Sequence, residues 1–177
     1  MIISVEKAKA LIDLNGWSDE KIRMKLKAVE QTIRAYTNNN FQNRECRLEA
    51  FIRGGVFHSD SLIPFNVGDT VQVSEARFNN GLFTVSAVTY DTTFMVDENT
   101  RDEEHVLVTK VVYPADVIDC CVNLLEWEKQ NRAKVGIQSE TLSRHSVTYF
   151  KQEPDNQIMG YPVSLLGCLK AYRKARC

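Results

Sequence analysis

The pattern of apolar and polar positions divides the chain into four helical regions and one region of short strands. Ser4 can cap a short first helix, and Ser18 can cap a longer second helix whose first turn carries two acidic residues. Asn15-Gly16 and Asn38-Asn39-Asn40 supply the breaks that end these two helices. The predicted helices span residues 4–14, 18–36, 114–132 and 163–176.

The predicted helix 114–132 is strongly apolar, and we expect the rest of the chain to be organised around it. Pro114 suits a helix start, because a residue of the first turn has no intrahelical partner for its N–H. Apolar side chains cover more than half of the circumference, which is typical of a helix packed on several sides. These side chains are Val117, Ile118, Cys120, Cys121, Val122, Leu124, Leu125 and Trp127. The helix 18–36 has a single row of apolar residues, narrower than the apolar face of helix 114–132, and such a row needs a partner helix. The row is Ile22, Leu26, Val29, Ile33 and Tyr36.

Between the second and third helices the pattern changes to short alternating runs separated by turn residues, which indicates strands. Asn80-Gly81 predicts a tight hairpin turn between Phe78 and Phe83, because both turn residues tolerate positive φ. Residues 97–104 are predicted to be a polar loop. The predicted strands are 47–53, 70–74, 82–88, 92–96 and 105–113. Such spacing favours an antiparallel sheet closed into a small barrel.

Together these elements predict an α+β protein: a small helical bundle core with an inserted small antiparallel β-barrel-like subdomain of the SH3 or OB kind. The predicted helical core comprises residues 1–43 and 113–177, and the insert comprises residues 44–112. Residues 137–150 form a polar run whose β-branched residues indicate an extended arm. The arm suits a strand donated to a neighbouring subunit and a plain surface loop equally well.

Composition and charge narrow the classes of function. The chain has 177 residues, of which 44% are hydrophobic, so it can bury a core of its own. Its net charge of −1 means that any contact with nucleic acid has to come from a local patch. Charged residues interrupt the apolar N-terminus, and no apolar run reaches the length of a membrane span. We therefore expect a cytosolic protein that makes no membrane contact.

The sequence offers little for catalysis. The five cysteines include no CxxC pair, so we expect reduced thiols and no metal. The chain has no phosphate-binding glycine loop, HExxH motif or GxSxG elbow, and its three histidines are far apart in the sequence. The acidic run 102–104 is interpreted as a solvated loop. These observations favour a protein that is not an enzyme and needs no cofactor.

Four stretches in this order resemble the head-tail connector, or adaptor, proteins of tailed bacteriophages. They are TIRAYTNNNF at 32–41, YPADVIDCCVNLLEWE at 113–128, KVGIQSETLSRHSVTY at 134–149 and GYPVSLLGCLKAYRK at 160–174. The order and spacing of these stretches carry the resemblance, since none is a catalytic signature. The insert 44–112 departs from the pattern of that family, because its short members have little more than a hairpin or loop at this position.

The resemblance implies a structural virion protein at the neck of the particle, made in the host cytoplasm. It would form a ring, dodecameric like the portal, that extends the DNA channel and provides the platform for the next head-completion, stopper or tail protein. DNA would pass without sequence-specific contact. The implied portal contacts are Tyr161, Pro162, Leu165, Leu166, Leu169, Tyr172 and Arg173. The implied contacts between neighbouring copies are Ile137, Ser139, Glu140, Thr141, Ser146 and Tyr149.

The alternative hypothesis is a binding module in which the small barrel recognises a peptide or single-stranded nucleic acid. Phe78, Phe83 and Phe94 of the insert support it. Against it, these rings alternate as core residues do, which leaves few aromatics for a stacking surface.

Overall fold

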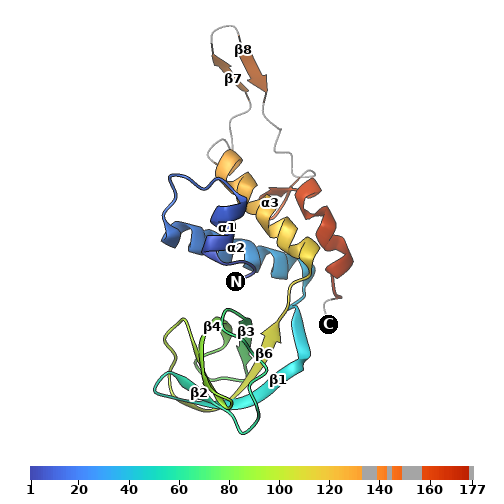
Figure 1. Cartoon of the computed structure of the whole chain (residues 1–177). Coiled ribbons are helices and arrows are strands. Elements are labelled where there is room, and N and C mark those ends of the chain that lie inside the picture. The colour runs from blue at the N-terminus through green and yellow to red at the C-terminus, as the bar shows by residue number, and fades with distance from the viewer. Residues whose placement is uncertain (133–138, 143–144, 149–156, 176–177) are drawn as a thin grey trace. The chain divides into compact units, whose positions relative to one another are not determined.

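The computed structural model describes residues 1–132, 139–142, 145–148 and 157–175 and divides the chain into two compact units (Figure 1). Unit 1 comprises Met1–Ile2 and Asn40–Tyr113, and unit 2 comprises Ile3–Asn39 and Pro114–Cys177. Unit 1 holds the strands β1 to β6, and unit 2 holds the helices α1, α2, α3 and η3. The predicted mixed α+β class is confirmed.

Both predicted serine caps of unit 2 are confirmed. The Ser4 and Ser18 hydroxyls accept hydrogen bonds from the backbone N–H groups of Lys7 and Lys21 at the starts of α1 (Val5–Leu11) and α2 (Asp19–Thr37). A side-chain oxygen at this position satisfies an N–H that has no partner inside the helix. Asn38 ends α2 in the left-handed conformation. The predicted extension of the first helix to Leu14 is wrong, because the backbone is already extended at Ile12.

The third helix, α3 (Ala115–Asn131), begins after Pro114 and contacts both α2 and η3. Most of its predicted apolar face is buried, whereas Ile118, Val122 and Trp127 are half-buried. The apolar row of α2 is buried at Ile22, Leu26, Val29 and Ile33. Helix packing of this kind removes apolar area from water, which stabilises the fold by roughly 25 cal/mol per Å².

The predicted terminal helix 163–176 is present but shorter, because η3 (Val163–Tyr172) ends before Arg173, and it is a 3₁₀-helix. A 3₁₀-helix has three residues per turn, so residues three apart lie in one row. Leu166 and Leu169 are therefore buried in one row, while Leu165 lies in another row and is half-buried. An α-helical period would have placed these three leucines on one face.

Unit 1 is a closed six-stranded antiparallel barrel in the order β1-β2-β5-β4-β3-β6, which confirms the predicted barrel. The strands are β1 (Gln42–Arg53), β2 (Val56–His58), β3 (Thr70–Ser74), β4 (Gly81–Tyr90), β5 (Thr93–Val96) and β6 (Glu103–Val111). Closure pairs β6 with β1 and leaves the sheet without a free edge. The core between the strands includes Ile52, Phe57, Val71, Phe94 and Val106.

Several details of the predicted strands are wrong. The short strand β2 was not predicted, because only three residues separate the Gly54-Gly55 turn from the following loop. Asn80-Gly81 is not a tight turn with positive φ: residues 75–80 connect β3 to β4, and Glu75 is the residue of this connection with positive φ. Glu103 belongs to β6 rather than to a solvated loop, and it is buried.

Two short antiparallel pairs follow α3. Strands β7 (Ser139–Leu142) and β8 (His145–Thr148) pair with each other inside the predicted arm. Strands β9 (Gln157–Ile158) and β10 (Tyr161–Pro162) are joined by Met159 and Gly160, which both have positive φ. Positive φ at both central residues is the requirement of the two-residue hairpin turn whose twist matches that of the strands.

Candidate interaction sites

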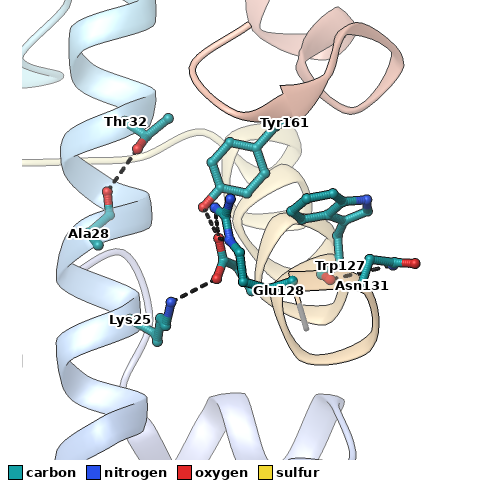
Figure 2. Close-up of polar contacts among 8 residues, drawn as sticks. Lys25, Ala28, Thr32, Trp127, Glu128, Asn131 and Tyr161 are labelled. Atoms are coloured by element: carbon teal, nitrogen blue, oxygen red, sulfur yellow. Dashed lines mark hydrogen bonds and ion pairs between the residues drawn. The ribbon is translucent and has the colours of Figure 1, made fainter. Parts of the chain in front are cut away.

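One end of the segment 157–175, here called the C-terminal segment, is held on α2 and α3 by one buried carboxylate. Glu128 of α3 is 4% exposed, and its Oε1 accepts a hydrogen bond of 2.9 Å from the Tyr161 hydroxyl of β10. Lys25 of α2 donates to Oε2 at 2.8 Å, and the Arg132 guanidinium donates to Oε1 through Nε at 2.9 Å and through a terminal nitrogen. Figure 2 shows Lys25 and Tyr161 reaching Glu128 from opposite sides. One carboxylate thus connects three elements of unit 2.

An aromatic pair lies beside this charged cluster. The centres of the Trp127 and Tyr161 rings lie 5.4 Å apart. Figure 2 shows the two side chains next to each other. The Arg132 guanidinium lies 5.2 Å from the Trp127 ring and 5.4 Å from the Tyr161 ring. A guanidinium is attracted to the negative face of an aromatic ring, so these contacts fix Arg132 while its N–H groups point to the carboxylate.

The surroundings of Glu128 keep it ionised. Burial alone would raise the pKa of Glu128, but hydrogen bonds from Arg132, Lys25 and Tyr161 lower it to about 2. Burial and the neighbouring carboxylate raise the pKa of Tyr161, so its hydroxyl stays a donor. A carboxylate with this pKa is a permanent anion at neutral pH and a poor proton carrier, since catalytic acids need a pKa near the working pH. The role that the structure shows for this cluster is to connect α2, α3 and β10.

The other end of the C-terminal segment is tied to the end of α2 and the start of α3. The Tyr172 hydroxyl donates to the Asp116 carboxylate at 2.7 Å, and this bond raises the pKa of Tyr172. The backbone N–H of Lys174 donates to the Thr37 carbonyl at 2.8 Å. The Arg173 guanidinium lies 5.4 Å from the Tyr36 ring. Both ends of the segment are therefore fixed to helices of the same unit.

The predicted portal contacts fall into two groups by exposure. Tyr161, Leu166 and Leu169 are buried inside unit 2. Pro162, Leu165 and Tyr172 are half-buried, and Arg173 is exposed. Because η3 has three residues per turn, Leu165 shares its row with Cys168 and Ala171, which are both exposed. This apolar row, Leu165–Cys168–Ala171, was not predicted because it depends on the 3₁₀ period.

The predicted contacts between copies lie only partly among the described residues. Ser139, Glu140, Thr141 and Ser146 belong to the β7–β8 pair, in which Thr141 is opposite Ser146. Ile137 and Tyr149 lie outside the residues that the structure describes.

Unit 1 carries a second candidate site, the connection 75–80 between β3 and β4, here called the Phe78 loop. Glu103 of β6 is 8% exposed and accepts hydrogen bonds from the backbone N–H groups of Arg77, Phe78 and Asn79 at 2.6, 2.9 and 2.9 Å. The Asn79 side chain also donates to Glu103 at 2.5 Å. Burial alone would raise the pKa of Glu103, but these donors lower it below its ordinary value.

The thiols of α3 are poor nucleophiles. Burial raises the pKa of Cys120 and, together with Glu30, raises the pKa of Cys121 to about 12. Nucleophilic cysteines need the opposite, a lowered pKa. Among the residues that the structure describes, no group of three or more His, Cys, Asp or Glu side chains is placed to hold a metal ion. Within the same residues, no helix is both long and apolar enough to cross a membrane.

Comparison with known proteins adds no assignment. Neither a scan against protein-family models nor a search of the curated proteins gives a match to this chain.

Proposed function

We propose that the chain is a head-tail connector of a tailed bacteriophage, which forms a ring beneath the portal and provides the platform for a stopper or tail protein. The resemblance of the four ordered sequence stretches carries this proposal. We also propose that α1, α2, α3 and η3 make up a small helical bundle core, and that the barrel is of the SH3- or OB-like kind.

The way in which the C-terminal segment is held supports the proposal. Tyr161 and Tyr172 tie its two ends to α3, so the row Leu165–Cys168–Ala171 is presented on a fixed backbone. Fixed apolar residues at a surface lower the entropy lost on binding. We propose this row, with Pro162 and Arg173, as the part of the segment that contacts the portal. The buried Tyr161, Leu166 and Leu169 would hold the row in place.

The test is association with the portal protein encoded in the same viral genome, measured by size-exclusion chromatography with light scattering. The wild-type chain is expected to form a larger complex with the folded portal ring. Ala171→Asp puts a charge into the proposed apolar contact and is expected to weaken the association about tenfold or more.

Ser164→Asp is the matched control, because Ser164 is also exposed on η3 but lies in a different row. It is expected to change the association little. A wild-type chain that does not associate with a folded portal would contradict the proposal. Equal weakening by the two variants would contradict the assignment of the row.

A specific observation favours a second candidate function, a small-β-barrel module that recognises a peptide or single-stranded nucleic acid. Phe78 of the barrel is 53% exposed on a loop fixed by Glu103. It is therefore not the core residue that the alternation of the sequence predicted.

A further inference from the structure

The Phe78 loop presents its side chains in a fixed conformation. Asn79 accepts a hydrogen bond from the Arg101 backbone N–H and donates to the Arg101 carbonyl, both at 2.9 Å. The Asn80 side chain accepts from the Ala76 N–H at 3.1 Å and donates to the Ala76 carbonyl. Together with the bonds to Glu103, these contacts connect the loop to the strand β6 and the residues before it. A loop held at so many backbone groups loses little entropy when a partner binds.

The Phe78 loop and the neighbouring Arg101 present one aromatic ring and two arginine side chains at the surface. The Arg77 and Arg101 guanidiniums lie 5.0 and 5.3 Å from the centre of the Phe78 ring. Both arginines are exposed, and within the part of the chain that the structure describes neither guanidinium makes a hydrogen bond or ion pair. Aromatic and arginine side chains are enriched among the residues that contribute most to protein–protein binding.

The free donors of these guanidiniums define the chemistry of a partner. The guanidiniums lie over the Phe78 ring and make no hydrogen bond within the described residues, so their N–H donors are left for planar acceptors, of which carboxylates fit best among protein groups. An exposed aromatic ring in addition suits an apolar side chain of the partner. The chemistry of the loop therefore suits a partner segment in which an apolar residue has carboxylates on either side.

The small number of basic groups favours a short acidic peptide segment over nucleic acid. Glu75, Glu98 and Asp102 flank the two arginines in sequence, and the whole chain has a net charge of −1. A polyanion binds through many phosphates to an extended basic surface. Two arginines among acidic neighbours do not provide such a surface, but they are enough for one or two carboxylates.

We propose that the Phe78 loop and Arg101 form a preformed docking site for a protein segment that carries carboxylates beside an apolar side chain. This inference rests on the second candidate function and names its partner class. It does not depend on portal binding, so its test and the test of the connector proposal can fail separately.

The experiment measures fluorescence anisotropy of labelled probes with the full chain at low salt. The probes are the pentapeptide Asp-Glu-Phe-Glu-Asp, its amide twin Asn-Gln-Phe-Gln-Asn and a ten-nucleotide oligothymidine. The acidic peptide is expected to bind at least about tenfold more tightly than its amide twin, since hydrogen bonds to charged groups are the stronger ones. Added salt is expected to weaken the binding.

The variants locate the binding. Arg77→Gln combined with Arg101→Gln is expected to weaken peptide binding about tenfold or more, and Phe78→Ala is expected to weaken it severalfold. Arg23→Gln combined with Arg44→Gln removes the same charge from exposed positions outside the loop and is the matched control. Circular dichroism of each variant checks that the barrel is folded.

Three results would overturn the inference. One is the absence of peptide binding to the folded wild-type chain at millimolar peptide. Another is equal weakening by the loop variant and the control variant, which would show a nonspecific charge effect. The third is tighter binding of oligothymidine through Arg77 and Arg101, which would make the loop a nucleic-acid surface.

Discussion

Replacing Glu128 tests how much one buried carboxylate contributes to holding the C-terminal segment at Tyr161. Glu128→Gln keeps the shape of the side chain but removes the charge that Lys25 and Arg132 face. The pKa of Glu128 falls from an ordinary value of 4.5 to about 2 in the folded chain. Each pKa unit corresponds to about 1.4 kcal/mol, so the ionised form contributes on the order of 3 kcal/mol to the free energy of unfolding.

The loss is not expected to be much larger than this. The side chains of Lys25 and Arg132 are 28% and 41% exposed, so both cations can regain water when the carboxylate is gone. Removing one partner of a fully buried pair costs more, about 3 to 5 kcal/mol, because the remaining charge has no access to water. We therefore expect Glu128→Gln to lower the free energy of unfolding by about 2 to 3 kcal/mol at pH 7.

The pH dependence gives a second, independent signature. Because the folded pKa of Glu128 is lowered, its contribution is fully present above the unfolded pKa of about 4.5. It is lost as the pH falls from there toward 2. The difference in stability between wild type and Glu128→Gln is therefore expected to be constant from pH 6 to 8 and to shrink toward zero near pH 2.

The assay is urea unfolding followed by tryptophan fluorescence. Trp17 and Trp127 are the two tryptophans of the chain, and both belong to unit 2, so the signal reports on that unit. Glu126→Gln is the matched control, since Glu126 is an exposed glutamate of the same helix. It is expected to change stability by less than about 0.5 kcal/mol. Equal effects of the two substitutions, or a difference that does not shrink in acid, would refute the reasoning.

Three further predictions concern other residues. Glu103→Gln weakens the acceptor for the N–H groups of Arg77, Phe78 and Asn79, so exchange of these amide hydrogens, measured by NMR, is expected to become about tenfold faster. Slower or unchanged exchange would contradict the assigned role of Glu103. Gly160→Ala is expected to destabilise unit 2 by about 1 kcal/mol in urea unfolding, because alanine disfavours positive φ; no loss of stability would contradict this. Cys121, whose pKa is about 12, is expected not to react with a thiol reagent at pH 8 in the folded chain, and mass spectrometry of labelled peptides checks this.

Elements whose cause is local could be predicted from the sequence. The caps of α1 and α2 follow from a serine before each apolar run, and the left-handed end of α2 follows from Asn38. Most strands of the barrel follow from alternation between turn residues. The barrel itself could be predicted because a sheet of many short strands has two edge strands with unpaired backbone groups, and closing the sheet into a barrel pairs them.

Elements that depend on tertiary contacts could not be predicted. The apolar residues of η3 fit an α-helical period as well as a period of three, and the difference decides whether Leu165 joins Leu166 or turns away from it. The strand β2 is too short to show alternation and is defined by its pairing with β1 and β5. The alternation of the sequence predicts a core position for Phe78, but Phe78 lies in a loop and not in a strand, so the period of a strand does not decide where its side chain points.

Glu103 and Glu128, two of the three buried glutamates among the described residues, escaped prediction for one physical reason, and that reason explains what they do. A carboxylate is buried only where enough donors replace its water, and some of the donors to each of these two glutamates come from segments distant in the sequence. Glu103 takes them from the Phe78 loop, and Glu128 takes them from α2 and from Tyr161 of β10. Neither the Phe78 loop nor the β9–β10 hairpin forms an extensive backbone ladder of its own. In each unit a buried charge supplies what regular secondary structure supplies elsewhere, a fixed backbone for residues at the surface. The Phe78 loop is therefore expected to lose its binding when Glu103 is replaced, and the row Leu165–Cys168–Ala171 when Glu128 is replaced, even though neither glutamate can reach a partner.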